Sequence, residues 1–270
     1  MTPNDPNLGN LSQIWAPFIP SSQMSTFQTI GSYWTQVGNG NTVVVSLNSM
    51  AMFKKNKCGS GCHTGGPGDG VLSWLHEVLK MAKSSGAAVI ISGHIPPVSD
   101  YWHNKCIESY SALATKYGST IVGHMFAHTH QDNYAILLDP TTGASNGVIN
   151  IAPSGVSTYN PSIRQYFYDT GSGLITDYTQ YYSNITQDNF YGKLTWKAEY
   201  TWRQAYGYGT WSINNWVNLD SRIGSDPNVK AQYLKYRYVS SGMTQFTKCT
   251  PALAELGHCV LHLDKHHNHD

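Results

Sequence analysis

The sequence has few charged residues and no excess of either sign. Asp, Glu, Lys and Arg make up 12% of its 270 residues, and the formal net charge is +1. A nucleic-acid surface needs a concentration of Lys and Arg that this chain does not have, and no basic run is present that would attract a membrane surface. The composition therefore excludes an electrostatic footprint for nucleic acid.

Long apolar runs are also absent, so the sequence predicts no transmembrane segment. The opening MTPNDPNLGNLSQIWAPFIP lacks the basic and apolar regions of a signal peptide. Nevertheless, Asn10-Leu-Ser12 and Asn184-Ile-Thr186 are glycosylation sequons, which together with five cysteines are typical of an oxidising compartment. We expect a secreted or lysosomal/vacuolar protein whose true N-terminus and signal peptide lie upstream of Met1.

The five cysteines cannot all pair within the chain, because their number is odd. Cys249 and Cys259 are close enough in sequence to close a short loop, whereas Cys106 can pair with Cys58 or with Cys62. The Cys58–Cys62 spacing is C-x3-C, which fits neither the usual zinc pairs nor haem attachment. We interpret the segment CGSGCH as a disulfide-stapled loop that covers the site.

Apolar runs alternate with amphipathic segments through the first 160 residues. Buried strands are predicted at residues 42–48, 87–92, 119–126, 133–139 and 147–159. Between them, the i, i+3, i+4 pattern predicts a helix from an N-cap at Asp69 to a stop at Gly86, and a second helix over residues 106–117. This order of elements predicts an α/β fold in which helices cover a sheet.

The pattern changes beyond about residue 165. Residues 164–184 indicate two antiparallel strands joined by a Gly turn, and helices are predicted to start at Asp226-Pro227 and at Pro251. We therefore divide the chain into residues 1–195 and a mainly helical appendage, residues 196–270, which contains Cys249 and Cys259. The tail histidines are metal-binding by composition alone, and we interpret them as a solvated end; they are His262, His266, His267 and His269.

Histidines stand where two predicted strands end. His94 follows the strand at 87–92, and His128 and His130 follow the next one. In an open α/β sheet these loops meet at one rim, and i, i+2 spacing puts two extended side chains on the same face. Imidazole is a common ligand of zinc. The pattern predicts a divalent metal site at these three residues, whereas His124, inside the strand, is interpreted as structural.

The segments GHIPP, HTH and APSGVSTYNPSIRQY, taken together, resemble the calcineurin-like metallophosphoesterases. More narrowly, they resemble the acid sphingomyelinase and acid sphingomyelinase-like phosphodiesterase branch, from about residue 8 to about residue 240. The resemblance implies a four-layer αββα sandwich, of which this chain would form the C-terminal part, holding two divalent metal ions, usually Zn²⁺. It also implies that a metal-bound hydroxide attacks phosphorus, converting sphingomyelin to ceramide and phosphocholine.

The resemblance assigns roles to individual residues. His94 and His128 would ligate the second metal and His130 the first, and Ala127 replaces the glycine of the G-H-T-H motif. A substrate-side loop is implied at Thr158, Tyr159 and Asn160. The partner implied is a sphingolipid or related small phosphodiester, with peripheral contact to lipid membranes.

Part of the expected ligand set is missing. No D-x-H, metal-binding G-D or G-N-H-(D/E) motif precedes His94, and Leu11 stands where LGN would need a histidine. We expect these ligands and the catalytic groups upstream of a truncated start, so that the 270 residues alone are inactive. Two alternatives remain open: a related metallophosphoesterase acting on nucleotides or polyphosphate, and a non-catalytic secreted remnant that binds through a Trp/Tyr-rich surface. Ser154 lacks the G-x-S-x-G setting of a serine hydrolase.

Overall fold

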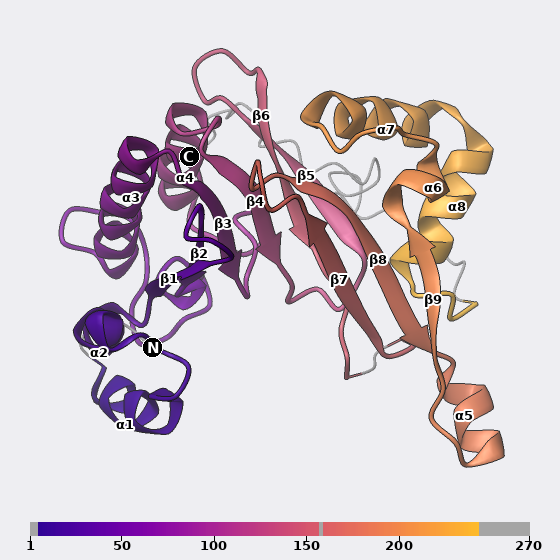
Figure 1. Cartoon of the computed structure of the whole chain (residues 1–270), viewed down its shortest axis with the longest axis horizontal. Helices are drawn as coiled ribbons and strands as arrows, with labels where there is room; N and C mark the ends of the chain where they lie inside the picture. The colour runs from indigo at the N-terminus through magenta and orange to yellow at the C-terminus, as the bar shows by residue number, and fades with distance from the viewer. Residues whose placement is uncertain (1–4, 157–158, 243–270) are drawn as a thin grey trace.

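Two β-sheets organise the chain, whose computed structural model describes residues 5–156 and 159–242 (Figure 1). The larger sheet has six strands in the order β1-β2-β3-β4-β6-β5, and the smaller has the order β7-β8-β9. The strands are β1 (Tyr33–Val37), β2 (Thr42–Leu47), β3 (Ala88–Gly93), β4 (Ile121–Phe126), β5 (Asn133–Leu138), β6 (Ser145–Ile151), β7 (Ser162–Tyr168), β8 (Ile175–Ser183) and β9 (Trp196–Thr201). The α-helices are α1 (Pro6–Trp15), α2 (Met24–Ile30), α3 (Pro67–Ser85), α4 (Asn104–Lys116), α5 (Ile185–Tyr191), α6 (Trp202–Tyr206), α7 (Ile213–Ser225) and α8 (Pro227–Arg237).

The predicted α/β core is confirmed. Strands β2, β3, β4 and β6 run parallel, and β1 and β5 are antiparallel strands at the two edges. Helices α3 and α4 cover one face of this sheet (Figure 1), where Val45, Val89, Ile91, Leu75 and Leu79 are fully buried. Because a parallel sheet is covered on its faces, its strands read as near-continuous apolar runs, which is why the sequence located them.

Two predicted boundaries are wrong. The N-cap of α3 is Gly66 rather than Asp69, because Pro67 takes the first helical position, where its missing N–H costs nothing. Asp69 lies in the first turn, where a carboxylate favours the helix dipole. The strand predicted over 147–159 is β6, which ends at Ile151; Pro153 follows closely and cannot donate to a ladder.

The second half of the chain, as far as it is described, supplies the smaller sheet and four helices. The predicted antiparallel pair is confirmed as β7 and β8. Residues from 196 onward open with β9, which pairs with β8 before α6, α7 and α8 follow, so the boundary between residues 195 and 196 stays a prediction. Asp226 is the predicted N-cap of α8 and accepts hydrogen bonds from the backbone N–H groups of Asn228 (2.8 Å) and Val229 (3.4 Å). The helix from Pro251, the Cys249–Cys259 pair and the tail histidines lie outside the described residues.

A second core, made largely of aromatic rings, lies beneath these helices. Tyr178, Tyr200, Trp202 and Trp216 are at most 7% exposed and pack against Tyr134 of β5. Much of the unusual Tyr and Trp content is therefore interior. Among the described helices, none combines the length and the apolar character that a membrane crossing requires.

A disulfide joins the loop before α3 to α4. Cys62, in the loop before α3, pairs with Cys106 in the first turn of α4, with 5.0 Å between the Cα atoms. This pairing selects one of the two partners that the sequence left open for Cys106. Cys58 is an exposed free thiol.

Candidate functional site

His94 and His128 meet at the rim where β3 and β4 end. His94 directly follows β3, and His128 lies two residues past β4. Their nearest ring nitrogens, Nε2 of His94 and Nδ1 of His128, are 3.3 Å apart. The backbone joins the two loops as well, because the Ala127 N–H donates to the carbonyl of His94 at 2.9 Å. The shared rim predicted from the sequence therefore brings these two imidazoles together.

Aromatic rings fix the orientation of His128. Tyr101 and Phe53 approach its ring edge-on, with centroids at 4.8 and 5.6 Å, and the His94 ring lies at 5.2 Å. Phe53 is itself held by a bridge to the fully buried Trp102. Edge-to-face contacts of this kind restrict how a ring can turn. His128 is thus presented to His94 in one arrangement.

His130 follows His128 in the same loop. Both His128 and His130 have positive φ angles, 75° and 60°, which residues other than glycine rarely adopt. Each such residue costs on the order of 1–3 kcal/mol, so the loop requires support from outside. The His130 side chain is exposed. Its charge lies near enough to lower the pKa of both other histidines.

Burial and neighbouring charges lower the pKa of both paired histidines. Burial lowers the pKa of His94, and the neighbouring His130 lowers it further. Burial also lowers the pKa of His128, with further contributions from His94, His130 and Lys55. Neutral imidazole is the form that ligates a metal, so the surroundings favour the ligating state of both rings.

The geometry of the pair fits one metal ion. Two ligands of a tetrahedral zinc ion, each bonded at about 2.0–2.1 Å, lie roughly 3.3–3.4 Å apart. The nitrogens of His94 and His128 are separated by 3.3 Å. Within the described residues, however, no group of three or more His, Cys, Asp and Glu side chains converges on a common point. The pair therefore supplies part of a metal site, and the placement of His130 as a ligand stays a prediction.

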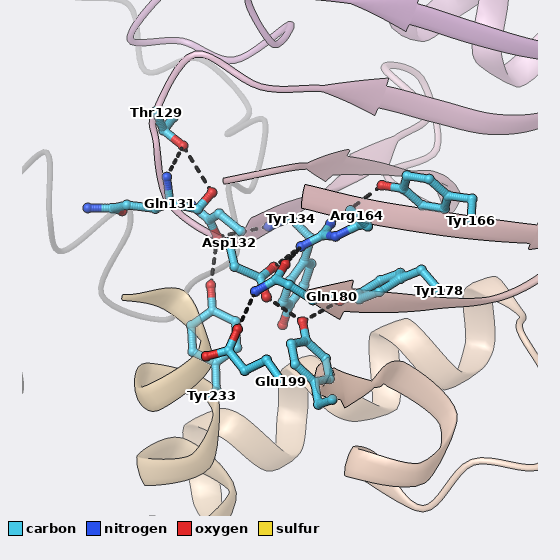
Figure 2. A network of polar contacts seen from close by, with 12 residues as sticks. Thr129, Gln131, Asp132, Tyr134, Arg164, Tyr166, Tyr178, Gln180, Glu199 and Tyr233 are labelled. Carbon is cyan, nitrogen blue, oxygen red and sulfur yellow. Dashed lines mark hydrogen bonds and ion pairs between the residues drawn. The ribbon is translucent and has the colours of Figure 1, made fainter. Parts of the chain in front are cut away.

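A buried polar network begins two residues after His130 (Figure 2). Asp132 accepts a hydrogen bond from Nη2 of Arg164 at 2.5 Å, in an ion pair whose side chains are 7% and 2% exposed, and another from the Tyr200 hydroxyl. Burial opposes the charge of Arg164, but Asp132 and neighbouring phenols raise its pKa well above the usual value. The same Arg164 nitrogen donates to Gln180 at 2.7 Å. This network connects the histidine loop to the smaller sheet.

Glu199 forms the far end of the network. It accepts hydrogen bonds of 2.7 Å from Gln180 Nε2 and from the hydroxyl of Ser240, at the strained turn after α8. Burial raises the pKa of Glu199 to about 7; these two hydrogen bonds oppose the shift and the nearby Asp132 adds to it. Glu199 is therefore a half-buried carboxyl whose pKa lies near neutral pH.

The residues predicted to contact substrate have different surroundings. The Tyr159 hydroxyl accepts from Gln131 Nε2 at 3.0 Å, beside the histidine loop. Asn160 is 5% exposed, and its side chain binds the backbone of Val239 and Ile185. Thr158 lies outside the described residues. A direct substrate role for these residues stays a prediction, and the observed bonds give Asn160 a structural role.

Other candidates lie away from the histidine pair. His124 is buried in β4, and its Nδ1 is 2.7 Å from the Tyr110 hydroxyl. Burial lowers the pKa of His124 to about 4. A cavity of about 350 Å³ lies along the disulfide loop and is lined by Lys54, Ser60, His63 and His103, but by none of the predicted ligands. Both sequon asparagines are helical or capping: Asn10 is exposed on α1, and Asn184 is the N-cap of α5.

Sequence reasoning missed the supporting residues Asp132 and Arg164. Asp132 and Arg164 are 32 residues apart, on different elements, and neither belongs to a recognisable ligand motif. Two signals were available: a carboxylate directly after HTHQ, and an arginine within a tyrosine-rich strand. Neither signal identifies the partner.

Comparison with known proteins identifies proteins of similar sequence. The family described as "Acid sphingomyelin phosphodiesterase C-terminal region" matches residues 145–266. Sphingomyelinase phosphodiesterase D of Dictyostelium discoideum is 31% identical over 251 residues, covering 87% of this chain and 56% of the relative. Sphingomyelinase phosphodiesterase C of the same organism is 26% identical, covering 86% and 55%. A cyclic GMP-AMP phosphodiesterase of Rattus norvegicus is 26% identical, covering 85% and 55%. The chain spans about half the length of these relatives.

The raised pKa of Glu199 makes the stability of the chain depend on pH. Its folded-state pKa of about 7 exceeds the ordinary value of 4.5, so its stabilising contribution is complete below pH 4.5 and is lost as the pH rises through 7. The unfolding free energy of the unmodified chain should therefore fall by about 3 kcal/mol between pH 4.5 and pH 7. Glu199→Gln should abolish this fall. Urea unfolding at pH 4.5 and pH 8 measures this difference, with Glu77→Gln, at an exposed position of α3, as the matched control. An equal pH dependence in Glu199→Gln and the unmodified chain would contradict the assignment.

Proposed function

We propose that this chain, which is similar to acid sphingomyelinases and acid sphingomyelinase-like phosphodiesterases, acts in the metal-dependent hydrolysis of a phosphodiester. The substrate class proposed is a sphingolipid, with sphingomyelin cleaved to ceramide and phosphocholine. The observation that carries the proposal is the His94–His128 pair, whose nitrogens stand at the separation of two ligands on one divalent ion.

The chain's own residues would bind and orient the metal. His94 and His128 offer neutral nitrogens, and Tyr101 and Phe53 keep the His128 ring from turning away. A divalent ion bound there would polarise the phosphoryl oxygens and lower the pKa of an attacking water. Zinc fits the imidazole donors and the nitrogen separation. A second ion, with His130 among its ligands, would need donors beyond those that the described residues bring together.

The proposed substrate can be separated from the related alternative by direct assay. A relative in this family is named a cyclic GMP-AMP phosphodiesterase, so nucleotide esters are the second candidate. Hydrolysis of phosphocholine esters in preference to nucleotides and polyphosphate by the full natural protein supports the sphingolipid assignment. The reverse preference would show that the same metal chemistry acts on a nucleotide or polyphosphate substrate. The Cys62–Cys106 disulfide supports a secreted or lysosomal location for either enzyme.

Removal of either paired histidine should stop turnover. We expect His94→Ala and His128→Ala in the full natural protein to lower metal-dependent turnover at least about 100-fold, because loss of a metal ligand exceeds the effect of losing an outer contact. His76→Ala, on α3, is the matched control and should retain activity. Thermal unfolding within a few degrees of the unmodified protein would show that the fold survives. Retained turnover in either paired variant would remove these histidines from the metal centre.

We propose that α5 makes peripheral contact with a lipid membrane. This helix projects from the end of β8, away from both sheets (Figure 1). Phe190, Tyr191 and Leu194 are 81%, 74% and 65% exposed, and Lys193 and Lys197 stand beside them. Aromatic and aliphatic side chains flanked by lysines are typical of segments that enter the headgroup region of a bilayer.

Polar substitution at this tip should separate lipid binding from chemistry. Phe190→Ser together with Leu194→Ser should reduce sedimentation with phosphatidylcholine–sphingomyelin vesicles several-fold, because the buried apolar area is lost. Hydrolysis of a water-soluble phosphocholine ester should be unchanged. The matched control is Leu174→Ser, which removes an exposed leucine from the β7–β8 turn. Vesicle binding by the double variant equal to that of the control would refute the role of α5.

A further inference from the structure

The loop carrying His128 and His130 adopts a conformation that its own residues disfavour. Both have positive φ angles, and neither is glycine. Between them the Thr129 N–H donates to the Ala127 carbonyl at 2.9 Å, and the Thr129 hydroxyl accepts from the Gln131 N–H at 3.3 Å and donates to the Gln131 carbonyl at 3.4 Å. A strained conformation persists only where its surroundings determine it. Contacts from outside the loop therefore add to these local hydrogen bonds.

Two buried arginines hold the end of this loop. The Asp132 N–H donates to the backbone carbonyl of Arg237 at 3.1 Å, and Nε of Arg237 donates to the Gln131 side chain at 3.0 Å. Arg164 binds the Asp132 carboxylate through Nη2 at 2.5 Å (Figure 2). Both residues that follow His130 are thus fixed, one by its side chain and the other by backbone and side chain together.

Arg164 is itself held on several sides. Its guanidinium lies 4.1 Å from the centroid of the Tyr178 ring, Nη2 also donates to Gln180, and Nη1 donates to the Tyr166 hydroxyl at 3.4 Å. These partners lie on β7 and β8 (Figure 2). A planar guanidinium can stack and donate in several directions at once, whereas a lysine ammonium is a single point of charge. The smaller sheet therefore sets where the Asp132 carboxylate lies.

We propose that Arg164 and Arg237 are positioning residues that hold the histidine loop so that His128 faces His94. They act through Asp132 and Gln131. The inference rests on the proposed function in so far as these histidines bind metal. Outer contacts that orient metal ligands typically change metal affinity about 10- to 100-fold when they are removed.

The test uses Arg164→Lys in the full chain, with Arg222→Lys as the matched control. Arg222 also stacks on an aromatic ring and donates to a carbonyl, but on α7, where it binds Tyr206 and Tyr208. Hydrogen exchange by mass spectrometry follows the peptide covering residues 127–132 without metal, and titration with Zn²⁺ alone gives the affinity. We expect exchange at least about tenfold faster in this peptide and zinc binding about 10- to 100-fold weaker for Arg164→Lys. The control should match the unmodified chain in both.

The outcomes separate this inference from the proposed function. Unchanged exchange and unchanged affinity in Arg164→Lys overturn the positioning role, as does an equal effect of Arg222→Lys. If Arg164→Lys does not fold, Gln131→Ala, which removes the side-chain contact with Arg237, replaces it with the same expected readouts. If the unmodified chain binds no zinc, the proposed metal centre falls, and the exchange of residues 127–132 alone decides the positioning role.

Discussion

The ion pair between Asp132 and Arg164 is the interaction on which the site depends. It joins the larger sheet, through the loop before β5, to β7 of the smaller sheet, and both side chains are almost fully buried. Buried charges are tolerated only when they are paired and hydrogen-bonded, and here Tyr200, Gln180 and Tyr178 surround the pair. Loss of either partner would leave the other charge buried without compensation. The packing of the two sheets and the course of the histidine loop are therefore coupled.

Glu199 extends this coupling toward the end of α8. The backbone after α8 turns through Val239 and Ser240, both with positive φ, and Glu199 binds the Ser240 hydroxyl. The same turn presents the Val239 carbonyl to the buried Asn160. A carboxyl with a pKa near 7 thus lies two hydrogen bonds from Arg164, through Gln180. Charge on Glu199 and support of the histidine loop belong to one polar network.

The sequence predicted the elements whose stability is local or repetitive. Strands β2 to β5 and helices α3 and α4 were found because parallel strands covered by helices produce β-branched runs and apolar stripes. The meeting of His94 and His128 followed from topology, since the ends of parallel strands share a rim. Strand β1 and helices α1 and α2 were not predicted: β1 is a half-buried edge strand, and the two helices bury only one apolar side chain each, Leu8 and Phe27. The choice of Cys62 over Cys58 also required the fold, because four residues of sequence cannot distinguish the two.

The arginine network could not be read from the sequence, because its partners are distant along the chain and follow no fixed spacing. The account's central claim is that this fold holds His94 and His128 as two ligands of one metal ion. Crystals of the chain grown with Zn²⁺ and measured at the zinc absorption edge test it most directly. The account predicts an anomalous peak about 2.0–2.1 Å from both His94 Nε2 and His128 Nδ1. Zinc bound only elsewhere on the chain, with no peak between these nitrogens, would contradict it.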